Sequence, residues 1–320
     1  MPNYLITGAA GFIGSHFCEY MVNNYPDSIF VGYDKLTYAG KMENLDSVIS
    51  HHNFHFIKGD ITDYGQVFET LTKYNIDIIV NFAAESHVDR SIEDSRAFIH
   101  TNVLGTQIML DAAKRNNVKR FHQVSTDEVY GDLPLNRKDL KFTENSHLKP
   151  SSPYSASKAS ADLLVMSYYK THNLPVSISR CSNNYGLNQD NEKLIPKVIS
   201  NAINNKKIPI YSKGENIRDW IHVSDHVTAI EKILLSQKSI GEVFNIGGEN
   251  EVSNIELVNL ILEKMSRESD LIEYVEDRKG HDLRYAIDNS KIFHMLKWQP
   301  VVNFNKGIDE LIAKIKLKPN

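Results

Sequence analysis

Two short segments contain side chains that could do acid–base chemistry. Tyr154 and Lys158 stand four residues apart, so on a helix a phenol and an ammonium would share one face. Asp127 and Glu128 are adjacent acids that directly follow Thr126. A Tyr–Lys pair at this spacing is common on protein surfaces, and an acidic pair is common in solvated turns. An elimination reaction, however, needs one proton donor and one proton acceptor, and two carboxyl groups could fill these roles.

The elements that must position these residues form an alternating pattern in the first half of the chain. Short β-branched runs alternate with amphipathic segments of helical spacing, which is typical of βαβ units and a parallel sheet covered on both faces. We therefore predict a doubly wound α/β (Rossmann) domain. The predicted strands are 4–7, 29–33, 54–57, 77–82, 121–125 and 176–179, and the main predicted helices are 12–22, 64–74, 97–115 and 155–171. Because neighbouring strand residues point to opposite faces, the backbone should leave β geometry at Asp127 if both acids are to act together.

The second half is less regular and predicts a smaller mixed α/β lobe that binds the substrate. Helical patterns near 194–204, 227–235, 255–265 and 305–315 are separated by short strands and Gly-containing turns. We place the boundary at Asn183, with 1–183 mainly the nucleotide-binding domain and 184–320 mainly the second lobe. Chain segments are expected to cross between the two lobes.

A glycine-rich turn follows the first predicted strand. Gly8, Gly11 and Gly14 form a Gly-x-x-Gly-x-x-Gly pattern that leads into a predicted helix, where free backbone N–H groups can hold a pyrophosphate. A tight strand-to-helix turn is the alternative interpretation. Asp34 stands twenty residues past Gly14, at the end of the second strand, and would accept hydrogen bonds from a ribose. This pattern predicts NAD rather than NADP, although the neighbouring Lys35 weakens the preference.

Asp60 and Ile61 follow the third predicted strand and would lie near the adenine, although Asp60 could instead cap the next segment.

Composition excludes several other classes of protein. A formal net charge of −4 without a long basic run argues against nucleic acid as the main partner. No signal sequence or membrane-spanning stretch is evident, so we expect a cytoplasmic protein. Cys18 and Cys181 are interpreted as packing residues, and the histidines show no metal-ligand spacing, so no metal site is expected.

Several motifs in order along the chain resemble those of the dTDP-glucose 4,6-dehydratase family, in the extended branch of the short-chain dehydrogenases/reductases. Asp127–Glu128 distinguishes this family from related epimerases and decarboxylases. The matching stretches are YDKLTYAG (33–40), NFAAESHVDRSI (81–92), TNVLGT (101–106), STDEVYG (125–131), SSPYSASKASAD (151–162), RCSNNYG (180–186), EKLIP (192–196), IRDWIHV (217–223), FNIGG (244–248) and DRKGHDLRYAID (277–288).

The resemblance implies a role for each residue of the two acid–base segments. Thr126 would hydrogen-bond the 4-hydroxyl of a nucleotide-linked glucose, and Tyr154 would deprotonate it while NAD accepts a hydride from carbon 4. Glu128 would then take the proton of carbon 5, Asp127 would protonate the departing 6-hydroxyl, and the hydride would return to carbon 6. Lys158 would hold the nicotinamide ribose and lower the pKa of Tyr154.

The same resemblance implies two sets of binding residues. The NAD site would comprise Gly8, Gly11, Phe12, Ile13, Gly14, Asp34, Lys35, Leu36, Thr37, Asp60, Ile61, Phe82, Ala83, Ala84, Ser86, Thr101, Tyr154, Lys158 and Asn184. The substrate site would comprise Ser86, Thr126, Asn183, Lys193, Leu194, Pro209, Tyr211, Arg218, Asn254, Arg284 and Tyr285, with Arg218, Asn254 and Arg284 on the diphosphate. Helix packing for Leu194 and a surface ion pair for Arg284 are the alternatives.

The chain also departs from the family pattern. Leu187 to Asn191 replaces a loop that usually carries proline and aromatic residues, and Ala9 stands where glycine is usual. These differences leave the base and sugar preference open.

Two other functions stay open. The first is another extended short-chain enzyme, such as a UDP-sugar 4-epimerase or decarboxylase; the second is a catalytically silent NAD-binding subunit. The resemblance further implies a homodimer built through helices near 97–115 and 155–171.

Overall fold

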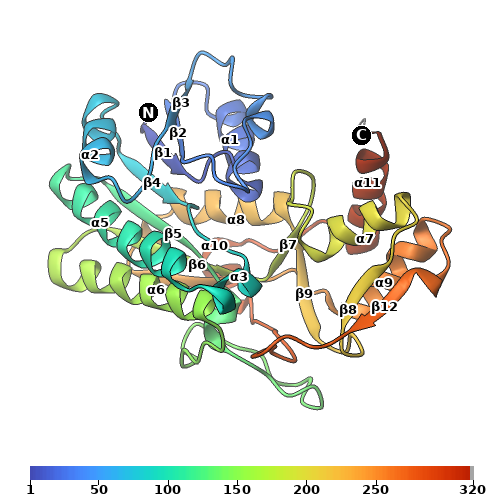
Figure 1. Cartoon of the computed structure of the whole chain (residues 1–320). Helices are drawn as coiled ribbons and strands as arrows, with labels where there is room; N and C mark the ends of the chain where they lie inside the picture. Colours follow the sequence, from blue (N-terminus) through green and yellow to red (C-terminus); the bar gives the residue numbers. More distant parts are fainter. Residues whose placement is uncertain (318–320) are drawn as a thin grey trace.

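A computed structural model describes residues 1–317 and contains one large parallel sheet (Figure 1). Its seven strands run in the order β10-β6-β5-β4-β1-β2-β3, and every neighbouring pair is parallel. A sheet of this kind needs helices on both faces to cover its apolar side chains. The strands are β1 (Tyr4–Thr7), β2 (Phe30–Asp34), β3 (Phe54–Lys58), β4 (Ile78–Asn81), β5 (Arg120–Thr126), β6 (Val176–Cys181) and β10 (Glu242–Ile246).

Two layers of helices bury the two faces of this sheet. Helices α2 (Tyr64–Lys73), α5 (Thr106–Arg115) and α6 (Pro153–His172) pack on one face around a core that includes Leu71, Leu110 and Val165. Helices α1 (Phe12–Asn24) and α8 (Val223–Leu235) pack on the other face, around Phe17 and Ile230. The predicted doubly wound α/β fold is therefore confirmed.

The predicted helix over 97–115 is interrupted. The structure instead has α4 (Arg96–Phe98), a π-helical segment η2 (Ile99–Gly105) and then α5. Asn102, in the π-helical segment, is buried and exchanges hydrogen bonds with both backbone groups of Glu85, and it also donates to the Ser157 hydroxyl. The irregular segment thus ties the chain after β4 to helix α6, a tertiary contact that helical periodicity does not reveal.

The rest of the chain forms a smaller lobe beside the sheet, on the right of Figure 1. It has two small sheets and its own core, which includes Trp220, Leu257 and Ile308. Its elements are β7 (Asn183–Tyr185), β9 (Ile217–His222) and β11 (Glu251–Ser253) in one sheet, β8 (Ile208–Tyr211) and β12 (Ile272–Val275) in the other, and helices α7 (Leu194–Ile203), α9 (Asn254–Lys264) and α11 (Phe304–Leu317).

Segments beyond residue 183 also belong to the large lobe. Strand β10 is an edge of the large sheet, α8 covers one of its faces, and α10 (Ser290–Leu296) packs near β10. Residues 318–320, the end of the expected second lobe, lie outside the described residues. No helix within residues 1–317 is both long and apolar enough to cross a membrane.

Candidate active site

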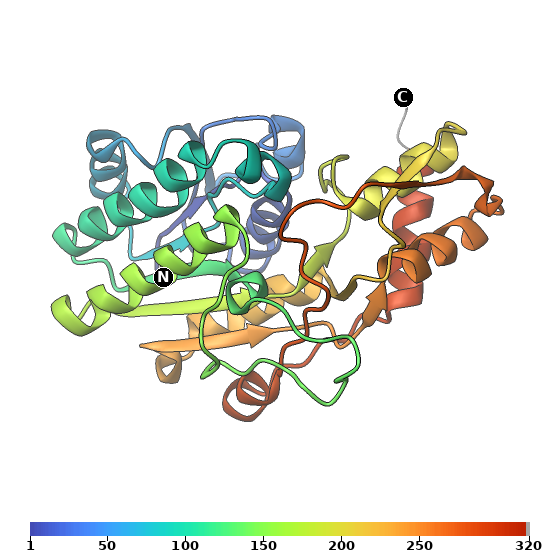
Figure 2. The same cartoon turned by 60° about the horizontal axis from the view of Figure 1, so that its bottom comes forward.

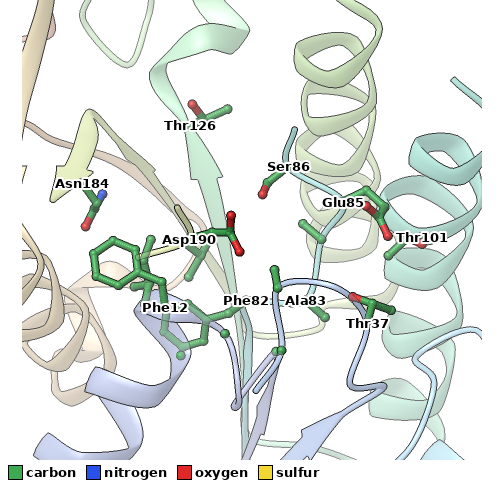
Figure 3. A pocket seen from close by; sticks show the side chains of 18 of the residues that line it. Phe12, Thr37, Phe82, Ala83, Glu85, Ser86, Thr101, Thr126, Asn184 and Asp190 are labelled. Carbon is green, nitrogen blue, oxygen red and sulfur yellow. The ribbon is translucent and has the colours of Figure 1, made fainter. Parts of the chain in front are cut away.

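A cavity of about 330 Å³ lies where the carboxyl ends of β1, β2, β4 and β5 meet the smaller lobe. The helical layers change from one side of the sheet to the other between β1 and β4, which is where ligands bind in open α/β sheets. Figure 3 shows Phe12, Phe82, Ser86, Thr126, Asn184 and Asp190 around this cavity.

The structure brings most of the predicted site residues together on the cavity wall. The lining includes Gly8, Gly11, Phe12, Ile13, Gly14, Asp34, Lys35, Thr37, Asp60, Ile61, Phe82, Ala83, Ala84, Ser86, Thr101, Asn184, Thr126, Asp127, Glu128, Tyr154, Lys158, Asn183 and Lys193.

The glycine turn leaves no room for side chains. Gly8 has φ +67°, and a Cβ there would lie 2.8 Å from the Ala83 nitrogen; a Cβ on Gly14 would lie 2.1 Å from the Gly8 oxygen. Gly11 is the N-cap of α1, where a glycine cannot cover the first N–H groups of the helix. The turn is therefore a cradle that fits a pyrophosphate, and NAD fits the residues present.

Asp34 is held at the cavity edge by two backbone groups. Its two carboxylate oxygens accept hydrogen bonds from the N–H groups of Ala10 at 2.9 Å and Leu36 at 2.8 Å. Lys35 forms an ion pair with Asp60 at 2.6 Å, which joins the ends of β2 and β3. The Leu36 side chain packs against the core on the α1 face and is not part of the cavity lining, and the contact of Leu36 with the cofactor stays a prediction.

The acidic pair follows the end of β5, as predicted. The strand ends at Thr126, and residues Asp127 to Tyr130 form a 3₁₀ turn (η3). The Thr126 hydroxyl caps this turn by accepting a hydrogen bond from the Glu128 N–H at 3.3 Å. The backbone thus leaves β geometry at Asp127, and both carboxyl groups line the cavity.

The two acids have different electrostatic surroundings. Burial raises the pKa of Asp127 well above its usual range, and the charges of Glu128 and Asp219 raise it further. Burial also raises the pKa of Glu128, but the positive charges of Arg278, Arg218 and Lys193 oppose that rise. Asp127 is therefore the side chain suited to donate a proton, and Glu128 is suited to accept one.

Tyr154 and Lys158 lie in the first two turns of α6, which starts with a capping box at Ser152. Lys158 Nζ donates to the Val124 carbonyl at 2.7 Å. Burial raises the pKa of Tyr154 well above its usual value, and the charges of Glu128, Cys181 and Asp127 add to the rise. The Thr126 hydroxyl lowers this pKa, but burial and the negative charges outweigh it, so ionising Tyr154 needs a further positive charge in the cavity; the lowering by Lys158 stays a prediction.

Only some of the predicted substrate residues line the cavity. Lys193 lines the cavity and donates to the Ser86 carbonyl at 3.0 Å, whereas Leu194, Pro209, Tyr211, Arg218, Asn254 and Tyr285 are not among the lining residues. Leu194 is the first residue of α7, and the Asn254 N–H donates to the Asn216 carbonyl at 3.0 Å. Arg218 stacks on the Tyr285 ring at 4.3 Å and acts on the pKa of Glu128.

The predicted role of Arg284 as a diphosphate ligand is wrong. Its side chain is fully buried, and both Nε and Nη2 bind the Glu251 carboxylate, at 2.7 and 3.0 Å. Its remaining N–H groups donate to the backbone carbonyls of Arg137, Lys138 and Leu140. Arg284 therefore fixes the loop between η3 and α6 against the chain that returns from β12. A β-bridge between Phe142 and Ile287 joins the same two segments, which run close together in Figure 2.

Arg278 is a site residue that the sequence reasoning missed. It belongs to the DRKGHD stretch, and its charge is the largest that opposes the pKa rise of Glu128. Its Nη1 lies 3.3 Å from an Asp89 oxygen, and its buried Nε has no hydrogen-bond partner among the described residues. Gly280, two residues further along, has φ +64°, and this glycine was the signal in the sequence for a turn next to Arg278.

The raised pKa of Asp127 gives a first prediction. In the unfolded chain Asp127 is ionised above about pH 4, but in the folded protein its pKa is raised. The free energy of unfolding therefore falls as the pH rises from about 4 to the pKa of Asp127 in the folded protein. Asp127→Asn should therefore raise the melting temperature, and more at pH 8 than at pH 5, with each kcal/mol giving about 2 to 4 °C. Calorimetry at the two pH values tests this. A variant less stable than wild type at pH 8 would contradict the electrostatic account.

An enzyme with this sheet, glycine turn and Tyr–Lys helix is a short-chain dehydrogenase/reductase, and the second lobe makes it one of the extended kind. The model of the family described as GDP-mannose 4,6 dehydratase matches residues 5–311. The chain belongs to this family of nucleotide-sugar dehydratases.

Individual relatives give a more detailed comparison. The chain is 49% identical over 308 residues to the low-salt glycan biosynthesis protein Agl12 of Haloferax volcanii, covering 96% of each chain. It is 46% identical to dTDP-glucose 4,6-dehydratase 1 of Escherichia coli, covering 96% of this chain and 91% of that one.

Solved structures agree with the sequence relatives. DesIV of Streptomyces venezuelae, a dTDP-glucose 4,6-dehydratase solved with NAD and dTDP bound, has a TM-score of 0.94 and 42% identity, with 98% of this chain and 97% of that chain covered. A UDP-glucuronic acid 4-epimerase of Bacillus cereus has the same fold, with a TM-score of 0.92, but only 28% identity.

Proposed function

We propose that this chain is an NAD-dependent nucleotide-sugar 4,6-dehydratase that converts dTDP-glucose to dTDP-4-keto-6-deoxyglucose. The observation that carries the proposal is the acid pair at the end of β5. Asp127 and Glu128 line one cavity with Tyr154, and burial raises the pKa of Asp127 well above its usual range, whereas three positive side chains oppose the rise in the pKa of Glu128. The relatives named dTDP-glucose 4,6-dehydratase support the same activity.

The first step is oxidation at sugar carbon 4. Thr126 and Tyr154 lie together at the carboxyl end of β5 and the start of α6, where the Thr126 hydroxyl bonds the phenol and opposes the rise of its pKa. Thr126 would hold the 4-hydroxyl and Tyr154 would take its proton. NAD held by the glycine turn, Asp34 and Lys158 would supply a reversible hydride acceptor and the positive charge that Tyr154 needs.

The second step is the elimination of water across carbons 5 and 6. A ketone at carbon 4 acidifies the proton on carbon 5, which Glu128 removes, while Asp127 donates a proton to the departing 6-hydroxyl. Return of the hydride to carbon 6 and of a proton to carbon 5 completes the sequence. Product and water account for all atoms of the substrate, so no external reductant is needed.

The positive side chains near Glu128 are suited to the diphosphate. Arg218, Arg278 and Lys193 all act on the pKa of Glu128, and guanidinium groups bind phosphate oxygens in pairs. We propose that Arg278 and Arg218 bind the diphosphate, with Arg278 taking the role that the sequence suggested for Arg284. Pro209 and Tyr211 on β8, together with Leu194 and Asn254, remain our proposal for the nucleotide end.

The acid pair also separates this function from that of a UDP-sugar 4-epimerase. An epimerase has to oxidise and reduce carbon 4 alone, so it has no use for a second proton donor and acceptor beside Tyr154. The lower identity to the solved epimerase favours the same conclusion. Incubation with dTDP-, UDP-, CDP- and GDP-hexoses, with mass spectrometry for loss of one water, tests both the reaction and the preferred nucleotide.

A second prediction concerns the bound cofactor. Because the same substrate is first oxidised and then reduced, the protein should purify with NAD and turn over without added reductant. Chromatography of the denatured protein measures the bound NAD(H). The absorbance of NADH during turnover measures whether the cofactor is reduced overall. Absence of bound NAD(H), together with one NAD consumed per product, would disprove the closed cycle.

We also propose that the protein works as a cytoplasmic homodimer. Four apolar side chains are exposed on the α3 (Val88–Glu93), η2 and α6 segments, which lie close together: Ile92, Ile99, Leu104 and Leu163 are 38 to 64% exposed. A patch of this kind suggests an interface. The cytoplasmic location is favoured because NAD and nucleotide sugars are cytoplasmic metabolites.

The third prediction tests the dimer. Light scattering should give twice the chain mass, and Leu163→Glu should shift the protein towards monomer. Leu235→Glu is a matched control, since Leu235 is 54% exposed on α8, which covers the opposite face of the sheet. A monomeric wild type, or equal effects of the two variants, would count against the proposed interface.

A further inference from the structure

A buried arginine joins the two segments that carry the acid–base residues. Arg180, on β6, donates from Nε to the Asp162 carboxylate at 2.9 Å and from Nη1 to the Tyr130 hydroxyl at 2.9 Å. Its guanidinium also lies over the Tyr130 ring, 4.9 Å from the centroid. The side chains of Arg180 and Asp162 are only 6% and 1% exposed.

Each partner of Arg180 belongs to a different catalytic segment. Asp162 is on α6, one turn beyond Lys158, so it moves with the helix that carries Tyr154. Tyr130 closes the 3₁₀ turn η3, two residues after Glu128. The Tyr130 hydroxyl donates in turn to the Asn245 side chain on β10 at 2.7 Å, and the Asn245 N–H donates to Glu144 at 2.8 Å.

We propose that Arg180 is a positioning residue that fixes the acid–base turn η3 relative to the base helix α6. This inference rests on the dehydratase function proposed above, in which one sugar must meet Tyr154 in the first step and Glu128 with Asp127 in the second. A guanidinium suits the task, because its rigid planar fork holds two partners in fixed directions, whereas the ammonium of a lysine is a single point charge.

The charges of the network fit the same role. Asp162 neutralises Arg180 in a buried setting, where an unpaired charge would be strongly unfavourable. Burial lowers the pKa of Lys158, and the Asp162 charge opposes that change. The network therefore supports the ammonium of Lys158 as well as the orientation of η3, although Arg180 itself does not line the cavity.

The two ends of the network can be separated by mutation. Tyr130→Phe removes the hydroxyl that links Arg180 and Asn245 to η3 but leaves the Asp162–Arg180 pair on α6 intact. Oxidation at carbon 4 uses Tyr154 on α6 and should stay within about twofold of wild type. Elimination uses Asp127 and Glu128 on η3 and should slow by about 10- to 100-fold, since small displacements of catalytic groups have effects of this size.

A single-turnover experiment measures both steps. After rapid mixing of NAD-loaded enzyme with dTDP-glucose, the rise of NADH absorbance reports oxidation, and its decay, with appearance of the 4-keto-6-deoxy product, reports the later steps. In Tyr130→Phe the rise should be normal and the decay slow. Arg180→Lys, which cannot hold both partners, should slow the rise and the decay. Tyr25→Phe is the control, because it also deletes a hydroxyl bonded to a partner, but that bond joins the end of α1 to Glu231 on α8 and does not involve η3.

The outcomes distinguish this inference from the underlying function. If Tyr130→Phe lowers both steps equally, or behaves like Tyr25→Phe, Arg180 does not position η3 through Tyr130. If Arg180→Lys does not fold, Tyr130→Phe alone decides. If wild type oxidises dTDP-glucose but never releases water, the dehydratase function fails, whatever the variants do.

Discussion

Glu128→Gln should still oxidise the sugar but stop before water is lost. The amide keeps the size of the side chain but cannot take the proton from carbon 5, and the opposing charges of Arg278, Arg218 and Lys193 remain in place. Loss of a general base typically lowers a step by about 10²- to 10⁴-fold, or about 3 to 5 kcal/mol. A single turnover should therefore show NADH absorbance that rises at a normal rate and persists.

Deuterated water gives an independent measurement of the same variant. The substrate should acquire no deuterium at carbon 5, because the proton there stays in place. Glu231→Gln is a matched control, since Glu231 is also a buried carboxylate with a hydrogen-bonded partner but lies on α8, outside the cavity lining. Deuterium incorporation at the wild-type rate in Glu128→Gln would assign the base to another residue.

Tyr154→Phe should block the reaction one step earlier. The ring would still pack against Phe98, whose centroid lies 6.3 Å away, but the hydroxyl that accepts the substrate proton is gone. Oxidation and every later step should fall together, by about 10²- to 10⁴-fold. The measurement is again the rise of NADH absorbance in a single turnover.

A same-helix control shows whether the effect is local. Tyr168 is also on α6, and its hydroxyl bonds Asp111 at 2.7 Å, so Tyr168→Phe removes a comparable hydrogen bond away from the cavity. This control should keep the wild-type rate of oxidation. Formation of NADH at a normal rate in Tyr154→Phe would show that another group takes the hydroxyl proton.

The cofactor half of the site could be predicted because its signals are local in sequence. Gly8, Gly11 and Gly14 are needed because the backbone of a single turn leaves no room for side chains. Asp34 ends the strand next to the one that leads into this turn. The break in β geometry at Asp127 also followed from the need to place two neighbouring acids on one side. The sequence did not show that the Leu36 side chain packs against the core, because neighbouring residues in the same loop need not face the same way.

The substrate half depends on contacts between distant segments, which a single sequence does not reveal. Arg278 and Arg284 stand six residues apart in one motif. Only the structure shows that Arg284 is surrounded by Glu251 and by backbone carbonyls of the 137–140 segment. The π-helical segment around Asn102 likewise depends on Glu85 and Ser157. The raised pKa of Tyr154 could not be foreseen either, because it results from burial among residues of separate elements.

The most direct test of the closed dehydration cycle is to follow the hydrogen of sugar carbon 4. Enzyme with bound NAD would be incubated with dTDP-glucose carrying deuterium at carbon 4, without added cofactor, and the product examined by mass spectrometry and NMR. The closed cycle predicts a product that has lost one water and carries the deuterium at carbon 6. Deuterium that stays at carbon 4, or that leaves with released cofactor, would contradict it.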